Sequence, residues 1–253
     1  MSQPIISVSN LVKKYGDFVA VDDISFEVAP GQIFGLLGPN GAGKTTTLEI
    51  IETLREKSSG KVIVDGWDLD KDAHAIKKII GVQLQAAGFY PNLNLREVIE
   101  LFGGLYNMKV DPKALLDSVQ LLDKANNKFK QLSGGQKQRF SIATTLINQP
   151  KIIFLDEPTT GLDPQARRNL WDLIKRLKAQ GTTVVLTTHY MDEAEILCDY
   201  VAVVDSGKII KQGSPDELID ELLSTGFTAP KKIKGASLED VFLHLTGKDL
   251  REA

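Results

Sequence analysis

The sequence predicts an α/β fold, and two features of its apolar segments indicate this class. Residues 152–155 and 184–186 are apolar at consecutive positions, which is typical of strands buried on both faces of a parallel sheet. Such segments alternate with helix-like ones and are punctuated by glycine, as in α/β proteins. The chain has 253 residues, 42% of them hydrophobic and 25% charged, which is ordinary for a globular protein with a sizeable core.

The remaining elements follow from the same patterns. Strands are expected at residues 5–8, 18–28, 32–37, 62–64, 79–84, 183–187 and 201–204, and a helix is expected at 44–56. Residues 93–148 differ, because helix-like stretches at 96–105, 112–122 and 133–148 dominate, and they indicate a helical insertion between two core strands. We expect one main domain over residues 1–224, with a helical subdomain at about 87–150, then a linker and short helix within 225–253.

The charge, the apolar runs and the cysteine content of the chain exclude several classes of protein. The formal net charge of -3 provides no global basic field that would attract nucleic acid or an anionic membrane surface. We find neither a signal peptide nor a run of about 18 apolar residues, so any membrane role is expected to come through a partner. The single cysteine, Cys198, excludes an intrachain disulfide, fits a reducing compartment and is expected to be a small buried apolar residue.

A glycine-rich loop with the spacing G-x-x-x-x-G-K-T lies between the strand at 32–37 and the helix at 44–56. Its glycines let the backbone curl around phosphate oxygens, and its N–H groups form an anion-binding cradle with the following helix N-terminus. Lys44 supplies a charge for the β- and γ-phosphates, and the Thr45 hydroxyl is a ligand for Mg²⁺. The predicted nucleotide contacts in this segment are Gly38, Pro39, Asn40, Gly41, Ala42, Gly43, Lys44, Thr45 and Thr46.

A pair of carboxylates, Asp156 and Glu157, ends the apolar strand at 152–155. Ligands of open α/β sheets bind beyond the carboxyl ends of the strands, so Asp156 is placed to hold Mg²⁺ beside the phosphate loop. Glu157 is a candidate general base that polarises an attacking water. An exposed helix start would explain an Asp-Glu pair alone, but the preceding strand and the phosphate loop favour the catalytic interpretation.

Two further segments distinguish among the phosphate-loop proteins. Residues 127–130 approach the guanine-reading Asn-Lys-x-Asp motif but lack the aspartate, which disfavours GTP specificity. Ser133 is a predicted N-cap followed by two glycines, and this helix start is a second anion site. Residues 132–136 read LSGGQ, about 20 residues before the Asp-Glu pair.

On these motifs the chain resembles the ATP-binding cassette (ABC) ATPase family over essentially its whole length. The resemblance implies a P-loop NTPase core with a mixed, mainly parallel sheet, an N-terminal antiparallel β part and a helical insertion carrying LSGGQ. It also implies that Tyr15 stacks on adenine, although an ordinary hairpin aromatic is the alternative. Gln85 would sense Mg²⁺ and the attacking water, with Gln83 as an alternative register on the same strand face. Asp163 would cross a dimer interface, and His189 would be a switch histidine near the γ-phosphate.

The resemblance further implies that two ATPase domains, identical or different, pair head to tail around ATP. Ser133, Gly134, Gly135 and Gln136 of one chain would complete the phosphate loop of the other. The implied second partner is an integral-membrane permease, with the chain peripheral on the cytoplasmic side. Residues 86–95, with Phe89, Tyr90 and Pro91, resemble the loop that touches the permease, and local packing is the alternative for these side chains.

Residues 189–195 and 237–247 resemble the ATPase subunits of ABC-2 type exporters, which include drug exporters. The alternative is a soluble ABC ATPase in translation or DNA repair. Members of those groups generally carry two cassettes or a long coiled-coil insertion, whereas this chain has one cassette and no sustained heptads. Its mild acidity also disfavours a nucleic-acid platform, so no nucleic-acid partner is expected.

Overall fold

The computed structural model describes residues 3–83 and 88–227. The contacts divide the chain into two units, Met1–Asp216 and Glu217–Ala253, which are described separately. The domain boundary after residue 224 stays a prediction, and the helix expected near the C-terminus lies outside the described residues. Helix α8 (Pro215–Ser224) runs from the first unit into the second, and its side chains Ile219, Leu222 and Leu223 are exposed.

An antiparallel sheet forms the N-terminal part of the first unit, as predicted. Its strands are β1 (Ile6–Tyr15), β2 (Phe18–Val28), β4 (Ser59–Val64) and β5 (Trp67–Asp68), in the order β2-β1-β4-β5. Strand β1 continues well beyond the predicted end at residue 8. Ser9, Asn10, Lys13 and Lys14 interrupt its apolar residues because one face of this antiparallel sheet meets solvent, and a search for apolar runs therefore misses the rest of the strand.

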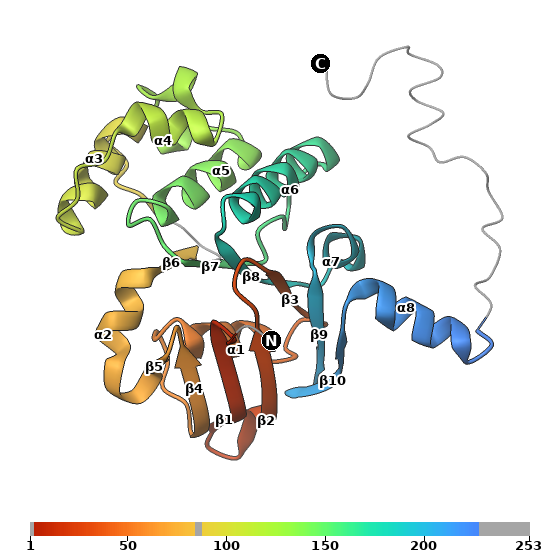
Figure 1. The fold of residues 1–253 in the computed structure, drawn as a ribbon. Helices are drawn as coiled ribbons and strands as arrows, with labels where there is room; N and C mark the ends of the chain where they lie inside the picture. Colours follow the sequence, from red (N-terminus) through yellow and green to blue (C-terminus); the bar gives the residue numbers. More distant parts are fainter. Residues whose placement is uncertain (1–2, 84–87, 228–253) are drawn as a thin grey trace, which may run out of the picture. The chain divides into compact units, whose positions relative to one another are not determined.

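A second, mainly parallel sheet carries the centre of the fold (Figure 1). Its order is β10-β9-β3-β8-β7-β6, and of the described pairs in this sheet only β9–β10 is antiparallel. Every residue of β3, β7 and β8 is buried, which confirms the prediction of strands covered on both faces. The strands are β3 (Ile33–Leu37), β6 (Ile80–Gln83), β7 (Ile152–Asp156), β8 (Thr183–Thr188), β9 (Tyr200–Asp205) and β10 (Lys208–Gly213).

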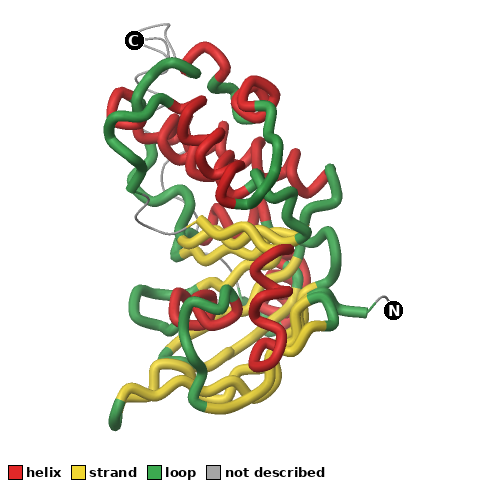
Figure 2. The backbone as a smooth tube through the Cα atoms, turned by 90° about the vertical axis from the view of Figure 1, so that its left-hand side faces the viewer, coloured by secondary structure: helices red, strands yellow, loops and turns green. Residues whose placement is uncertain are grey.

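Helices fill the connections between these strands. The helices of the first unit are α1 (Lys44–Ile51), α2 (Leu69–Ile79), α3 (Leu95–Leu105), α4 (Pro112–Ser118), α5 (Gly134–Thr145), α6 (Pro164–Ala179) and α7 (Met191–Leu197). Helices α3, α4 and α5 form the predicted insertion between β6 and β7. Figures 1 and 2 show this insertion on one side of the parallel sheet, with the antiparallel sheet on the other.

Three helices end earlier than the sequence predicted. Helix α5 stops at Thr145 rather than residue 148, and for the other two the backbone shows the reason. Helix α1 stops at Ile51 rather than residue 56, and Thr53 adopts a φ of 63°. Helix α4 stops at Ser118 rather than residue 122, and Gln120 adopts a φ of 58°. A residue with positive φ cannot continue a right-handed helix, and neither side chain signals this conformation in the sequence.

An apolar core between the two sheets encloses α1. Leu48, Ile50 and Ile51 of α1 are at most 1% exposed and belong to the same buried cluster as residues of both sheets. The stacked rings of Phe26 and Phe34, with centroids 5.0 Å apart, join the sheets directly. Since each buried side chain of this size contributes about 1.5–3 kcal/mol, the helix that follows the phosphate loop is held firmly in place.

An aromatic cluster fixes the start of the helical insertion. The ring centroid of Phe89 lies 4.6 Å from that of Phe129, 5.1 Å from that of Phe140 and 6.1 Å from that of Phe102. Local packing, the alternative interpretation, therefore describes Phe89 correctly. Tyr90, by contrast, is 59% exposed.

Replacement of Gly81 by alanine is expected to destabilise the fold. A Cβ atom on Gly81 of β6 would lie 2.3 Å from the backbone oxygen of Thr145 in α5, so strand and helix would have to separate. We expect Gly81→Ala to lower the free energy of unfolding by about 1–3 kcal/mol in urea titrations. Gly104→Ala in α3 is the control, because nothing lies within 4 Å of its Cβ position, and a gain of up to about 1 kcal/mol is expected. Equal stabilities of Gly81→Ala and wild type would contradict the prediction.

Candidate functional site

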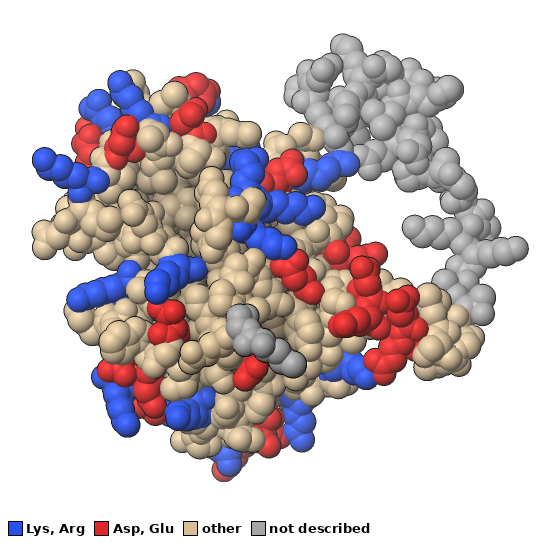
Figure 3. Space-filling view, viewed as in Figure 1, with Lys and Arg blue, Asp and Glu red and all other residues tan. Residues whose placement is uncertain are grey.

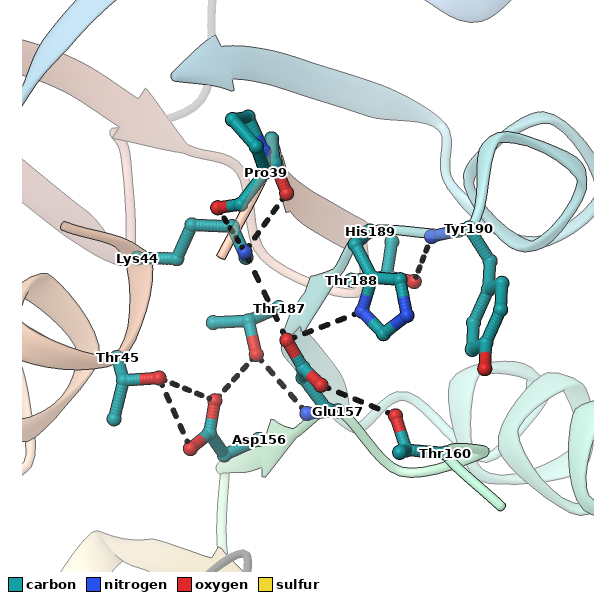
Figure 4. Close-up of polar contacts among 11 residues, drawn as sticks. Pro39, Lys44, Thr45, Asp156, Glu157, Thr160, Thr187, Thr188, His189 and Tyr190 are labelled. Atoms are coloured by element: carbon teal, nitrogen blue, oxygen red, sulfur yellow. Dashed lines mark hydrogen bonds and ion pairs between the residues drawn. The ribbon is translucent and has the colours of Figure 1, made fainter. Parts of the chain in front are cut away.

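The predicted phosphate loop, the two carboxylates and the histidine lie at the carboxyl ends of three neighbouring parallel strands. The phosphate loop follows β3, the pair Asp156 and Glu157 ends β7, and His189 follows β8. In the register of the sheet, Leu37 lies opposite Thr188, and Asp156 lies opposite Thr187. The structure thus brings the loop, both carboxylates and the histidine together at one edge (Figure 4).

A pocket of about 400 Å³ lies over the phosphate loop. The β1–β2 hairpin supplies one wall through Tyr15, which is 41% exposed, and Phe18. Lys13 and Arg55 place their cationic groups 5.0 and 5.5 Å from the Tyr15 ring centroid. The described lining residues are Tyr15, Phe18, Ala20, Asn40, Gly41, Gly43, Lys44, Thr45, Thr46 and Glu157. A larger groove of about 790 Å³ elsewhere has no lysine or arginine among its described lining residues, so it is poorly suited to phosphate.

The loop glycines serve packing as well as the predicted curvature. A Cβ on Gly38 would lie 2.0 Å from the carbonyl oxygen of Val204 in β9, and one on Gly43 would lie 2.4 Å from that of Ala20. Gly41 has open space around it but adopts a φ of 81°. Two of the three glycines are therefore required by close approach to other strands, which the local sequence does not reveal.

Lys44 is 4% exposed, and its ammonium faces the loop and the carboxylates. Its Nζ donates hydrogen bonds to the carbonyl oxygens of Gly38 at 2.8 Å and Pro39 at 2.9 Å, and lies 3.8 Å from Glu157 Oε1. Burial lowers the pKa of Lys44 from its ordinary value, while the charges of Glu157 and Asp156 act in the opposite direction. The arrangement presents a buried positive charge at the floor of the pocket.

Asp156 and Thr45 form an oxygen pair that could hold a metal ion. The Thr45 hydroxyl lies 3.1 and 3.2 Å from the two carboxylate oxygens of Asp156, which is 6% exposed. Hydroxyl and carboxylate oxygens are the ligands that Mg²⁺ prefers, so this donor set fits the ion. Gln85, the third predicted ligand, lies outside the described residues. Gln83, its alternative, is 3% exposed, and neither of its amide atoms has a hydrogen-bond partner.

Glu157 is held in place by three neighbours. Its backbone N–H donates to Thr187 Oγ1 at 3.0 Å, and that hydroxyl in turn donates to Asp156. Its carboxylate accepts from Thr160 Oγ1 at 3.1 Å, and His189 Nδ1 approaches Oε1 to 3.2 Å without hydrogen-bond alignment. Glu157 has a φ of 45°, an uncommon conformation for a residue other than glycine. A water beside this carboxylate could therefore be polarised next to both Lys44 and His189.

The LSGGQ segment forms a separate, exposed helix start. Ser133 caps α5 as predicted, since its hydroxyl accepts from the Gln136 N–H at 3.4 Å while Gln136 Oε1 accepts from the Ser133 N–H at 3.0 Å. A Cβ on Gly135 would lie 2.7 Å from that of Ala166, so the start of α5 packs tightly on the start of α6, which Asp163 caps. Within the described part of the chain, residues 132–136 do not line the nucleotide pocket.

Sequence reasoning missed several polar residues around this site. Thr160 and Thr187 contact the carboxylates, but threonine is too common in strands and loops to stand out. Glu52 follows directly after Ile50 and Ile51, but Glu49 precedes them, so the local sequence does not show which of the two acids is buried. Glu52 is 2% exposed, its Oε1 has no hydrogen-bond partner, and burial, with the charges of Asp156 and Glu49, raises its pKa to about 8.

Comparison with known proteins identifies the family of this chain. A family model described as ABC transporter matches residues 21–160, more than half of the chain. The chain belongs to the ABC transporter family. The Nod factor export ATP-binding protein I of Cupriavidus metallidurans is 42% identical over 221 residues, covering 85% of this chain and 73% of that protein. The daunorubicin resistance ATP-binding protein DrrA3 of Streptomyces coeruleorubidus is 41% identical, covering 86% and 71%.

Solved structures of cassettes share the fold. A nucleotide-free ATP-binding cassette from an ABC transporter matches with a TM-score of 0.78 and 27% identity, covering 88% of this chain and 96% of that one. A dimeric cassette in a post-hydrolysis state, bound to ADP and phosphate, matches with a TM-score of 0.73 and 29% identity, covering 83% and 98%. The predicted fold class is confirmed.

The family assignment confirms the predicted activity at the level of the subunit. The chain is an ATP-binding subunit of an ABC transporter, an ATPase coupled to transport, in the branch that contains these export ATPases. ABC cassettes form dimers and pair with membrane partners. Within residues 3–83 and 88–227, no helix is long and apolar enough to cross a membrane.

The raised pKa of Glu52 predicts a pH-dependent stability. Glu52 keeps its proton in the folded state up to about pH 8, whereas its ordinary pKa is 4.5, so folding binds a proton between these values. Stability contributed by the neutral carboxyl is therefore lost as pH rises from about 4.5 to 8, by at most about 1.4 kcal/mol per unit. Glu52→Gln removes this loss, so its free energy of unfolding should rise relative to wild type between pH 5.5 and 7.5 in urea titrations.

The control for this experiment is Glu56→Gln, four residues along the chain, where the side chain is exposed. Its stability should follow the wild-type pH dependence. If the free energy of unfolding of Glu52→Gln had the same pH dependence as that of wild type across this range, Glu52 would have to be ionised in the folded protein.

Proposed function

We propose that this chain is the ATP-hydrolysing subunit of an exporter, and that it works as a head-to-tail pair of ATPase domains on a separately encoded integral-membrane permease. One observation carries the proposal. The pocket over the phosphate loop and the exposed Ser133 helix start are two anion-binding surfaces, and the second does not line the first among the described residues. A single chain therefore offers two halves of a site that a pair would complete twice.

The pocket side of this site would bind and orient the nucleotide. Tyr15 would stack on the adenine, and the loop N–H groups and Lys44 would hold the β- and γ-phosphates, with Thr46 beside them. Thr45 and Asp156, with Gln85, would hold Mg²⁺, which when bound neutralises phosphate charge. Glu157 would orient and deprotonate the attacking water, and His189 would sit beside it near the γ-phosphate.

The second chain would supply the other wall. The γ-phosphate carries negative charge, and the N-terminus of a helix attracts such charge. Ser133, Gly134, Gly135 and Gln136 of the second chain would therefore close over the nucleotide, with Asp163 at the interface. Hydrolysis removes the bridging charge, so the pair opens, and this cycle of closure and opening would drive the permease. The pair could contain two copies of this chain or two different ATPases.

The names of the relatives and the exposed surface of the chain support a permease as the partner. The relatives' names refer to Nod factor export and daunorubicin resistance, which supports export rather than the alternative role in translation or DNA repair. Tyr90, within the segment 86–95 that resembles the permease-contacting loop, is exposed. Basic and acidic side chains are interspersed on the face in Figure 3, so that face presents no continuous basic surface for nucleic acid. We place the chain at the cytoplasmic face of the membrane through its permease.

Purification of the tagged chain from detergent-solubilised membranes would test the partner class. A stoichiometric polytopic membrane protein, with ATPase activity that responds to its removal, is the expected result. Co-purification of ribosomes or DNA ends in its place would support the alternative function.

Glu157→Gln is expected to bind ATP normally but to turn over at least about 100-fold more slowly, because an amide cannot accept the water proton. The unhydrolysed ATP should then keep the pair closed, and light scattering with Mg-ATP should show a dimer that disperses with ADP. A species that remains monomeric at saturating ATP would argue against the two-chain site.

Ser133→Arg is expected to bind ATP like wild type and to lose ATPase activity, because Ser133 serves the nucleotide of the other chain. Ser118→Arg places the same side chain on the exposed end of α4 and should keep full activity. If the pair is a homodimer, Ser133→Arg mixed with Lys44→Ala should regain part of the activity, because the mixed pair contains one site with both halves intact. A loss of ATP affinity in Ser133→Arg itself would show that Ser133 acts within its own chain.

A further inference from the structure

Helices α6 and α7 are joined by two side-chain links just behind the catalytic edge. The Arg167 guanidinium of α6 lies 4.6 Å from the ring centroid of Tyr190, and its Nη1 lies 3.3 Å from Asp192 Oδ2. One turn further along α6, Trp171 Nε1 donates to Glu193 Oε1 at 3.0 Å, and both side chains are buried. The segment after β8 is therefore fastened to the first turns of α6.

Tyr190 is in direct contact with the predicted switch histidine. The rings of His189 and Tyr190 have centroids 4.1 Å apart, and the Tyr190 N–H donates to Thr188 Oγ1 at 3.0 Å (Figure 4). His189 in turn approaches Glu157 to 3.2 Å. A continuous series of contacts thus runs from Arg167 through Tyr190 and His189 to Glu157.

The other end of this series lies at the start of α6. Asp163 caps that helix, and the Arg167 N–H donates to the Asp163 carbonyl at 3.0 Å, so Arg167 belongs to the first turn. A displacement of the α6 start would consequently carry the guanidinium with it. Because Tyr190 packs on that guanidinium, the orientation of His189 depends on where α6 begins.

We propose that Arg167 is a positioning residue for ATP hydrolysis: by packing on Tyr190 and pairing with Asp192 it holds His189 against Glu157. This inference rests on the proposed roles of Glu157 and His189. It gives the start of α6, where Asp163 lies, a direct influence on the catalytic pair. Closure of the second chain against Asp163 would then align His189 in the same motion that completes the nucleotide site.

The chemistry of the contact favours arginine over lysine. The Nε of Arg167 is buried without a hydrogen-bond partner, as expected when the flat guanidinium is used for packing rather than for a full set of hydrogen bonds. A planar, delocalised cation stacks on an aromatic ring, whereas an ammonium supplies a point charge. Asp192 is half exposed, so its ion pair alone would orient the side chain only weakly. The stack on Tyr190 is therefore the contact that the function requires.

Steady-state ATPase kinetics of the full chain test the proposal. Arg167→Met should lower kcat roughly tenfold with KM for ATP nearly unchanged, because misplacement of a catalytic group slows chemistry and Arg167 does not line the pocket. Arg167→Lys keeps the charge but not the stack, so its kcat should lie between those of wild type and Arg167→Met. Lys175→Met, which removes an exposed cation further along α6, is the matched control and should retain wild-type kcat.

Coupling to Tyr190 gives a second, independent readout. Tyr190→Leu should lower kcat about as much as Arg167→Met, and the double variant should lose little more, because both changes break the same series of contacts. Tyr190→Leu also keeps the proposal testable if Arg167→Met does not fold. Additive losses in the double variant would overturn the proposal.

In the Glu157→Gln background, Arg167→Met should leave ATP-driven dimerisation intact, since the proposed role lies in hydrolysis and not in assembly. Wild-type kcat in Arg167→Met, or loss of the dimer in that background, would refute the positioning role. Failure of the proposed catalytic site would look different, because Glu157→Gln and His189→Ala would then themselves retain turnover.

Discussion

The in-register parallel pairing of β3, β8 and β7 is the constraint on which the whole site depends. Pairing places Leu37 opposite Thr188 and Asp156 opposite Thr187, so three loops begin at one edge. A slip of one residue would reverse the face of every side chain in the slipped strand and separate Thr187 from the Asp156 carboxylate and the Glu157 N–H. Because these strands are buried on both faces, such a slip would put side chains of the wrong size into close-packed positions and is therefore costly.

The sequence could predict those parts of the site whose chemistry is local. The phosphate loop, the Ser133 cap and the carboxylates at the end of β7 each depend on a short run of residues with a fixed spacing, and the structure places them at a pocket, a helix start and a strand end. The parallel sheet could also be predicted from the sequence, because strands buried on both faces are apolar at consecutive positions. Family resemblance then supplied Tyr15 and His189, which no local rule would have selected.

The parts that escaped prediction depend on contacts between distant segments. Gly38 is required because Val204 packs against it from β9, more than 160 residues away. Glu157 has a left-handed backbone, and its N–H donates to Thr187 of the neighbouring strand. The early ends of α1 and α4 arise from positive φ at Thr53 and Gln120, residues with no strong local preference for that conformation. Local sequence patterns do not reveal which distant segments of the chain come into contact.

The contacts around the start of α5 explain why the two halves of the site need not act independently. Gly135 allows α5 to pack on Ala166 at the start of α6, and Gln138 Nε2 donates to the Pro158 carbonyl at 2.8 Å, one residue after Glu157. Helix α5, which begins at the exposed Ser133 surface, is thus packed on α6 and hydrogen-bonded through Gln138 to the loop that carries Glu157. Packed cores shift in discrete steps rather than deforming smoothly, so a load on that surface reaches the loop. In the proposed two-chain site, phosphate binding by the Ser133 surface of a chain and hydrolysis in its own pocket would therefore share one mechanical framework.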